Sequence, residues 1–390
     1  MRAYFDHNAT TPPDPLVIEA VARALADDFG NASSVHHFGQ RAKALLDDSR
    51  SAVAELIGAE PAELVFTSGG TEADNLALRG AAEALELSGA TGGGSARRHI
   101  ITTSIEHEAV LNTVKALAKR GWHTTLLPVD ASGVVAPAAL AAAITPQTAL
   151  VSVMHANNEI GTIQPIADLA AIAHEHGAMF HTDAVQSVAK IPVDVRALGV
   201  DLLALSAHKF NGPKGTGALW IRRGIRLVST MTGGKHERNR RGGTENVPGI
   251  AGMGAAARLA RRKLAGDSAR VAALRDRLER GILQSVSGTM VNGATTRRVP
   301  NTTNISFEGI EAESLLIALD LEGFAVSTGS ACSSGTLEPS HVLRAMGLPS
   351  HRTQNSIRFS LGAGNDEAQV DALLATLPAT VGKLRSLVRR

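Results

Sequence analysis

The sequence predicts an α/β protein with one mainly parallel, seven-stranded sheet flanked by helices, followed by a smaller α+β domain. Between residues 60 and 225, short runs of β-forming residues alternate with longer Ala- and Leu-rich stretches, as in strands joined by helical crossovers. Several of the short runs are apolar on both faces, which is typical of buried parallel strands. A chain of 390 residues also exceeds the usual size of a single core, which favours two domains.

Seven segments have the length and composition of strands in this sheet. They are Leu64–Thr67, His99–Thr103, Thr124–Val129, Ala149–His155, Met179–Asp183, Leu202–Ser206 and Gly217–Ile221.

A long amphipathic helix is expected over Ser268–Val286, where apolar residues recur at helical spacing with Arg and Glu between them. This helix is expected to leave the large domain. We therefore predict a large domain over residues 14–258 and a small domain formed by residues 1–13 and 259–390.

Composition and charge exclude several classes of function. Lys plus Arg number 39 and Asp plus Glu 37, and the formal net charge of +2 is too weak to gather nucleic acid or an anionic membrane. No apolar run reaches the roughly 18 residues of a membrane helix, and the amino terminus has no apolar signal core. We expect a soluble cytoplasmic protein with a small-molecule ligand and no membrane or nucleic-acid partner.

Cys332 is the only cysteine, which excludes an internal disulfide and a zinc site built from several thiolates. Lone cysteines usually pack in a core, but the stretch 327–336 around Cys332 is rich in Ser and Gly and is too polar for that. A reactive thiol on a loop that swings is the better interpretation. We expect no dedicated metal site, because no histidine falls in a His-Glu-x-x-His frame.

The segment Leu64–Asn75 contains a Gly-Gly turn between a strand and the start of a helix. Unpaired backbone N–H groups and the helix dipole at such a turn favour an anion, so Gly70 and Thr71 are candidates for a phosphate cradle. Taken alone, the same pattern fits an ordinary helix cap equally well or better.

Two charged residues follow apolar strands and point to a cofactor. Asp183 ends the strand Met179–Asp183, where a carboxylate needs a cationic or hydrogen-bonding partner such as a protonated pyridine nitrogen. Lys209 follows the strand Leu202–Ser206 into a confined cleft, where desolvation lowers the pKa of an amine and favours imine formation. Together they have the arrangement that a pyridoxal phosphate site requires.

Two other segments could suggest different ligands, namely nucleic acid and NAD. The basic run Lys235–Arg241 is short and lacks interleaved aromatic residues, so it favours loop support or a subunit contact over nucleic-acid binding. The glycines of Gly252–Ala257 follow no strand and precede no suitably placed acidic residue, so they do not predict NAD binding.

Motifs along nearly the whole chain resemble those of cysteine desulfurases of the NifS/IscS type, which are class V aminotransferase-fold enzymes. The matching segments are Asp6-His-Asn-Ala-Thr-Thr-Pro12, Phe29-Gly-Asn31, Thr67-Ser-Gly-Gly-Thr-Glu72, Glu106-His107, His155-Ala-Asn-Asn-Glu-Ile-Gly161, Asp183-Ala-Val-Gln186, Ser206-Ala-His-Lys209, Arg241-Gly-Gly-Thr-Glu-Asn246, Gly329-Ser-Ala-Cys-Ser-Ser-Gly335 and Ser356-Ile-Arg-Phe-Ser-Leu-Gly362.

The resemblance implies a fold type I transferase, pyridoxal 5′-phosphate as cofactor, and a role for each matching residue. Lys209 would form the Schiff base, Asp183 would pair with the pyridinium nitrogen, and His107 would stack on the ring and shuttle a proton. The remaining implied contacts are Gln186 and Asn158 at the ring hydroxyl, Gly70, Thr71, Ser206 and His208 at the phosphate, Thr244 at the phosphate from the second subunit of a homodimer, and Arg358 with Asn31 at the substrate carboxylate.

The implied reaction converts L-cysteine to L-alanine and leaves a persulfide on Cys332. The sulfur would pass to an acceptor such as an iron–sulfur scaffold protein, and Cys332 could transiently ligate a nascent cluster. A selenocysteine lyase or another class V pyridoxal-phosphate enzyme would share the lysine and the aspartate. A non-catalytic scaffold for cluster-assembly partners is the alternative from a different class.

Overall fold

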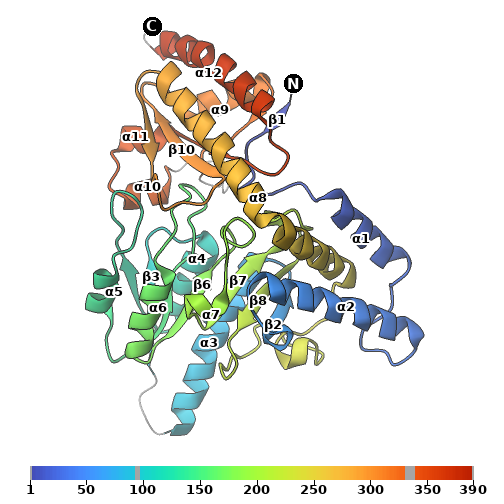
Figure 1. Cartoon of the computed structure of the whole chain (residues 1–390). Coiled ribbons are helices and arrows are strands. Elements are labelled where there is room, and N and C mark those ends of the chain that lie inside the picture. Colours follow the sequence, from blue (N-terminus) through green and yellow to red (C-terminus); the bar gives the residue numbers. More distant parts are fainter. Residues whose placement is uncertain (1, 93–96, 330–338, 389–390) are drawn as a thin grey trace.

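The computed structural model describes residues 2–92, 97–329 and 339–388 of the chain (Figure 1). Its largest sheet has seven strands in the order β2-β8-β7-β6-β5-β3-β4, and β3 to β7 run parallel to one another, whereas β8 is antiparallel to both β7 and β2. The strands are β2 (Leu64–Thr67), β3 (His99–Thr103), β4 (His123–Leu127), β5 (Thr148–Ser152), β6 (Met179–Asp183), β7 (Leu202–Ser206) and β8 (Gly217–Ile221).

The predicted α/β class and the mainly parallel seven-stranded sheet are confirmed. Five of the seven strands have the predicted bounds. The other two begin one residue earlier than expected and end two or three residues earlier, because their limits follow pairing with β3: His99 lies opposite both His123 and Thr148.

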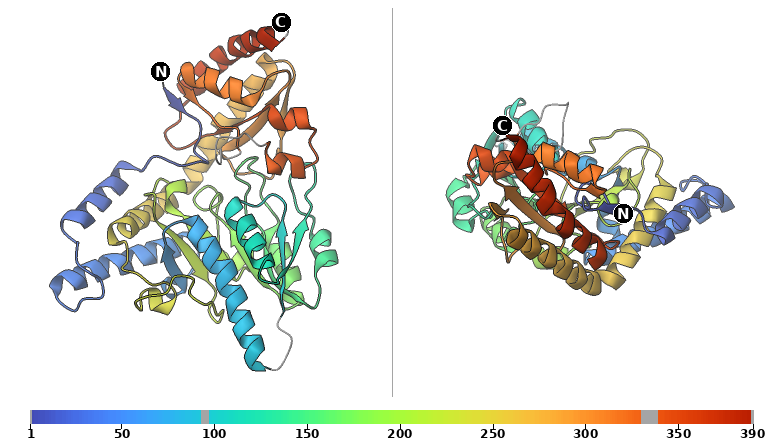
Figure 2. Two further views of the ribbon diagram at one scale, coloured as in Figure 1. Left: turned by 180° about the vertical axis from the view of Figure 1, so that it is seen from behind. Right: turned by 90° about the horizontal axis from the view of Figure 1, so that it is seen from above.

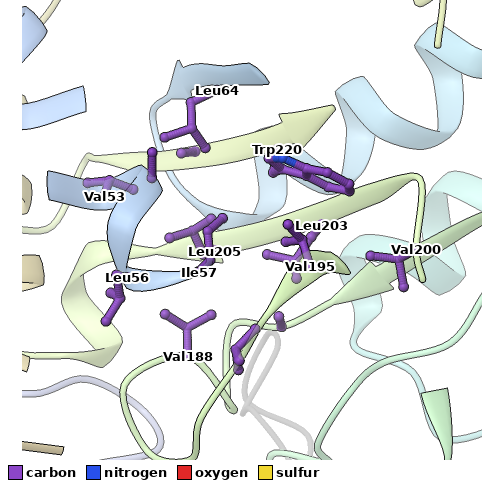
Figure 3. Close-up of a cluster of buried hydrophobic side chains, with 14 of the residues drawn as sticks. Val53, Leu56, Ile57, Leu64, Val188, Val195, Val200, Leu203, Leu205 and Trp220 are labelled. Atoms are coloured by element: carbon purple, nitrogen blue, oxygen red, sulfur yellow. The ribbon is translucent and has the colours of Figure 1, made fainter. Parts of the chain in front are cut away.

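Helices cover both faces of this sheet and explain why its strands are apolar on both sides. On β7, Leu203 and Leu205 belong to one buried cluster, which includes Trp220 and the end of α2, whereas Leu202 and Ala204 belong to a second cluster beneath α3 and α4 (Figure 3). Successive side chains of a strand point to opposite faces, so each strand contributes to two cores. These helices are α2 (His37–Leu56), α3 (Gly70–Gly92), α4 (Glu108–Ala118), α5 (Pro137–Ala143), α6 (Ile166–Glu175) and α7 (Val195–Leu198).

The longest helix, α8 (Val247–Ser285), has 39 residues and joins the two cores of the chain (Figure 1). Its first half packs against α1 (Pro15–Ala26) and α2, and an added Cβ at Gly254 would lie 2.7 Å from the Cα of Ser49. Glycine at this position therefore permits close helix packing. The helix expected over Ser268–Val286 is the second half of this longer element.

The second core combines both ends of the chain. Phe5 packs with residues of α8 and of the elements that follow it, and the two termini lie at this end of the molecule (Figure 2). A three-stranded antiparallel sheet has the order β12-β10-β9, and β1 pairs with β11 in parallel. The elements are β1 (Ala3–Tyr4), β9 (Thr289–Asn292), β10 (Thr302–Phe307), α9 (Ala312–Leu321), β11 (Phe324–Ala325), α10 (His341–Ala345), α11 (Ser350–Gln354), β12 (Ser356–Ser360) and α12 (Glu367–Val388).

The domain boundaries at residues 13/14 and 258/259 stay a prediction. Within the described residues, no helix is long and apolar enough to cross a membrane. In that same part of the chain, no group of three or more His, Cys, Asp or Glu side chains is arranged to hold a metal ion.

Candidate active site

The carboxyl ends of β2, β6 and β7 meet at one edge of the large sheet, and the predicted site residues follow them. Gly217 of β8 lies opposite both Thr67 and Ser206, which brings the turn after β2 beside the end of β7. An added Cβ at Gly217 would lie 2.7 Å from Gly69 and from the carbonyl oxygen of Leu205. Only glycine at position 217 allows this turn to pack so closely.

Lys209 lies at the end of a short 3-10 turn, η2 (Ala207–Lys209), directly after β7. Its Nζ donates to the carbonyl oxygens of Asn8 at 2.5 Å and Ala9 at 2.8 Å. Burial, with a further contribution from the Arg358 charge, lowers the pKa of Lys209 to about 8. The neutral, nucleophilic amine is therefore a minor form at neutral pH, but it is far more populated than in an ordinary lysine.

Asp183 ends β6 and is only 5% exposed. Its Oδ1 accepts from the backbone N–H of Val185 at 2.9 Å. Burial raises the pKa of Asp183, and the charges of His107 and Lys209 oppose that rise. A cationic group brought beside this carboxylate would stabilise its ionised form, as a protonated ring nitrogen does.

His107 caps the amino end of α4, and its Nδ1 accepts from the backbone N–H of Ala109 at 3.1 Å. In the neutral ring this contact leaves the proton on Nε2. The side chain is exposed and lies close enough to Asp183 for their charges to interact. His107 and Asp183 therefore belong to the same part of the molecule, and the predicted stacking and proton-transfer roles of His107 stay predictions.

Asn8 joins the predicted residues into one hydrogen-bond network. Its carbonyl oxygen accepts from Lys209 and, at 3.0 Å, from Nε2 of Gln186. Its side-chain Nδ2 donates to the carbonyl oxygen of Asn158 at 3.0 Å, and its Oδ1 accepts from the buried Lys190 at 2.9 Å. The network connects the first residues of the chain to both the large sheet and the second core.

Arg358 lies on β12 and is 4% exposed. One guanidinium nitrogen donates to Oδ1 of Asp6 at 2.6 Å, and another donates to the carbonyl oxygen of Asn158 at 3.0 Å. Its Nε has no partner among the described residues. This Nε is itself buried, so the guanidinium is short of one hydrogen-bond partner, and the planar group suits a carboxylate.

The proposed partner of Arg358, Asn31, is not beside it. Asn31 lies in the loop between α1 and α2, is exposed, and accepts from the backbone N–H of Ser33 at 2.9 Å. This loop stands at the edge of the molecule, away from the sheet that contains β12 (Figures 1 and 2).

The predicted phosphate contacts surround the turn after β2. The Oγ of Ser206 is buried without a hydrogen-bond partner among the described residues, and Gly70 begins α3 next to it. Thr71 is exposed on the first turn of α3. His208 contacts Oγ1 of Thr10 through Nδ1 at 3.1 Å, and burial together with neighbouring lysines lowers its pKa to about 4.

Thr244 is exposed in the segment that precedes α8. Close to it in sequence, Arg241 forms an ion pair with Glu72 on the first turn of α3 at 2.9 Å. This ion pair ties the Thr244 segment to the helix that begins at Gly70. The role of Thr244 at the phosphate of a second subunit stays a prediction.

Pyridoxal phosphate fits the residues present. An unpartnered buried hydroxyl at Ser206 and a helix start at Gly70 suit a phosphate, and buried Asp183 suits a protonated ring nitrogen. Lys209 supplies an amine with a lowered pKa.

Cys332 lies outside the described residues. The described residues on either side of its segment converge on Glu159: Ser340 donates to its carboxylate, and an added Cβ at Gly329 would lie 3.2 Å from it. Just before Gly329, Ser327 exchanges backbone hydrogen bonds with Arg358. The described residues just before the segment of Cys332 therefore lie beside the predicted substrate arginine.

Sequence reasoning missed several buried polar residues at this site. Lys190 and Asn8 belong to the network described above, and Glu106 lies beneath His107 with its pKa raised by burial to about 8. Asp74 is also buried, with its Oδ1 3.5 Å from Nε2 of His181. Asn8 and Glu106 lie in segments that match the family motifs, but nothing in the sequence indicates which side chains they contact.

Comparison with known proteins identifies the family of the chain. The model of the family described as Aminotransferase class-V matches residues 3–373. A protein named Cysteine desulfurase IscS from Dictyoglomus turgidum is 48% identical over 384 residues, covering 98% of this chain and 95% of that protein.

Two solved structures resemble the chain closely. One described as a NifS-like protein has a TM-score of 0.91 and 38% identity, covering 98% of this chain and all of the other (100%). Another, described as SspA in complex with cysteine, has a TM-score of 0.81 and 35% identity, covering 93% and 99%. The chain belongs to the class-V aminotransferase family, and its relatives place it among the cysteine desulfurases. The enzyme class expected from the sequence is thus confirmed.

Proposed function

We propose that this cysteine desulfurase binds pyridoxal phosphate through Lys209 and uses Cys332 to take the sulfur of L-cysteine. The observation that carries the proposal is that three features lie together. Lys209, whose pKa is lowered, and the buried Asp183 lie at one edge of the sheet. The described residues just before the segment of Cys332 lie beside Arg358. Binding of cysteine by the SspA structure, a relative of this fold, supports the choice of substrate.

The cofactor would be held by the residues that the family motifs indicate. Asp183 would contact the ring nitrogen, Gln186 and Asn158 the ring hydroxyl, and His107 the ring face. Gly70, Thr71, Ser206 and His208 would hold the phosphate. When bound, pyridoxal phosphate supplies an electron sink for the charge left on the α-carbon of the substrate.

Lys209 and Arg358 would act on the bound amino acid. The guanidinium of Arg358, which contacts Asp6 and the carbonyl of Asn158, would bind the substrate carboxylate. Nζ of Lys209, once released, accepts the α-proton, for which a pKa of about 8 is well matched to neutral solution. Asn31 lies away from Arg358 within one chain, and its part in binding the substrate carboxylate stays a prediction.

Cys332 would then receive the sulfur. Its thiolate attacks the substrate sulfur, a sulfur–sulfur bond forms, and the carbon–sulfur bond breaks. The electron pair of the broken bond goes to the carbon that becomes the methyl group of L-alanine, and His107 is the proposed carrier of the proton that this carbon needs. The persulfide on Cys332 passes to an acceptor such as an iron–sulfur scaffold protein.

A homodimer is part of the proposal. Large apolar side chains are exposed along residues 16–38, which span α1, the loop after it and the first two residues of α2, and a second copy would cover them. They are Leu16, Ile18, Leu25, Phe29, Val35 and Phe38, each 48% to 88% exposed. Thr244 would reach the phosphate of the partner subunit, and the mass in solution from light scattering tests the dimer. The cytoplasmic location stays a prediction.

The test is alanine formation from L-cysteine by wild type, Lys209→Ala and Cys332→Ser. The proposal requires wild type to be active and both variants to lose alanine production. Alanine production by Lys209→Ala would overturn the role of that lysine. A selenocysteine lyase would instead retain activity on selenocysteine in Cys332→Ser, and a non-catalytic scaffold would bind no cofactor.

A further inference from the structure

Lys190 is a buried lysine that the proposed mechanism does not use. It is 9% exposed and forms no ion pair among the described residues. Its Nζ donates to the side-chain oxygens of two neutral residues, Asn8 at 2.9 Å and Gln186 at a shorter distance. Burying a lysine is costly, so a position that retains one without a carboxylate partner calls for a specific role.

The backbone around Lys190 is held so that its side chain points toward Asn8 and Gln186. Ala189 has a φ of 63°, a left-handed conformation that is unfavourable for alanine. The hydroxyl of Ser268 on α8 donates to the carbonyl oxygen of Lys190 at 2.6 Å. A strained residue on one side and a helix contact on the other therefore fix the direction of the Lys190 side chain.

Lys190 decides how the amide of Gln186 is oriented. The Nζ of Lys190 donates to the amide oxygen Oε1, and in its charged form this group can only donate. The carbonyl oxygen of Asn8 can only accept, so it must face the amide nitrogen Nε2, which lies 3.0 Å away. The two contacts agree, and exchange of the oxygen and nitrogen of Gln186 would place like groups against each other at both ends.

Asn8 is held in the same way. Its Oδ1 accepts from Lys190 and from Nδ2 of Asn301 at 2.9 Å each, and its Nδ2 donates to Asn158 and, at 2.8 Å, to Oγ1 of Thr302. Every polar group of the Asn8 side chain therefore has a partner of the opposite kind. The carbonyl of Asn8 that orients Gln186 is fixed by this network.

We propose that Lys190 is a positioning residue that holds Gln186 with its amide N–H toward the cofactor ring oxygen. The proposal rests on the proposed function, because it assigns Lys190 to the same pyridoxal phosphate site. The amide nitrogen has two hydrogens, and its only acceptor among the described residues is the carbonyl of Asn8. The second hydrogen is available to a ligand. Without Lys190, only the contact with the Asn8 carbonyl opposes exchange of the amide oxygen and nitrogen, and the exchanged amide would turn its oxygen toward the electron-rich ring oxygen, which repels it.

The test is a double-mutant cycle on the affinity of the cofactor-free protein for pyridoxal phosphate. Lys190→Met and Gln186→Leu are each expected to weaken binding about tenfold. Because Lys190 acts through Gln186, the double variant should bind no more weakly than Gln186→Leu alone. Unchanged binding by Lys190→Met, or an additive loss of about a hundredfold in the double variant, would overturn the proposal.

The visible absorbance of the bound cofactor gives a second readout that a merely structural role would not move. Loss of a donor to the ring oxygen strengthens that oxygen as a partner for the imine proton, so the pH midpoint of the absorbance change should rise in Lys190→Met and equally in Gln186→Leu. Different shifts in the two single variants contradict a shared pathway.

Folding is checked by thermal unfolding of the cofactor-free variants. If Lys190→Met does not fold, Lys190→Gln, whose amide is also a donor, replaces it and should retain more affinity than Gln186→Leu; equal or greater loss contradicts the proposal. Failure of wild type to bind pyridoxal phosphate would instead refute the proposed function. The two failures are therefore distinguishable.

Discussion

Removal of Glu237 is the most severe test of how the Thr244 segment is held. Glu237 begins the 3-10 turn η3 (Glu237–Asn239), and all three of its residues have left-handed φ angles of 44°, 57° and 66°. Such angles cost roughly 1–2 kcal/mol per residue, so the turn needs external support. Its position four residues before Arg241 connects it to the Glu72 contact at the start of α3.

That support is a buried ion pair with Arg50. Both side chains are nearly inaccessible, at 6% and 3% exposure, and the two carboxylate oxygens accept from the guanidinium at 2.7 and 2.9 Å. Glu237 also accepts from the backbone N–H of Phe66 at 2.9 Å, and Arg50 donates to the carbonyl of Leu64 at 3.0 Å. The pair therefore fixes the turn to β2.

Glu237→Ala should destabilise the protein by about 3–5 kcal/mol, because it leaves a buried guanidinium unpaired. Urea unfolding followed by the fluorescence of Trp220, which is fully buried in the same core, measures the loss. Asp48→Ala is the matched control: its partner Arg258 lies 3.0 Å away, but the two side chains are 63% and 43% exposed, so the loss should be below about 1 kcal/mol.

The double variant Arg50→Met with Glu237→Met should lose less than Glu237→Ala alone, because no charge stays buried. A loss for Glu237→Ala as small as that for Asp48→Ala would refute the reasoning.

Three further predictions concern backbone strain, a buried acid and a close contact. Ala189→Gly should raise stability by roughly 1 kcal/mol by relieving its φ of 63°, and a lower melting temperature would contradict this. The raised pKa of Glu106, about 8, means that the folded state keeps a proton that the unfolded state loses above pH 4.5, so wild-type stability falls as the pH rises toward 8. Glu106→Gln, which has no such proton, should gain stability relative to wild type by up to about 1.4 kcal/mol per pH unit in that window, and a pH-independent difference in urea unfolding contradicts this. Gly217→Ala should weaken pyridoxal phosphate binding at least about tenfold by displacing the Gly69 turn, whereas Gly266→Ala, which contacts nothing within 4 Å, should leave binding unchanged; equal affinities would contradict the packing argument.

Much of the fold could be predicted because its strands are buried on both faces. Runs such as Leu202–Ser206 are apolar throughout, and the structure places their alternating side chains in two cores. The ends of β4 and β5 could not be predicted from the sequence, because pairing with the neighbouring strand β3 determines where they begin and end. The first half of α8 also escaped prediction, because its Gly- and Ala-rich residues are buried on several sides and lack an amphipathic period.

The candidate site could be predicted as a set of residue types but not as a network. Lys209 and Asp183 follow apolar strands, so their position at the sheet edge follows from the parallel topology. The contact between Lys190 and Asn8 joins residues 182 positions apart, and no local pattern indicates it. The roles of Asn31 and Thr244 stay predictions, because within one chain neither lies against the residues it is expected to assist.

Intact-mass analysis after incubation with L-cysteine tests the central claim most directly. The account predicts that wild-type protein gains one sulfur atom, that L-alanine appears with it, and that Cys332→Ser gains none. Sulfur bound to Cys332→Ser, or alanine formation by wild type without any gain in mass under conditions that lack an acceptor or a reducing thiol, would contradict transfer to this thiol.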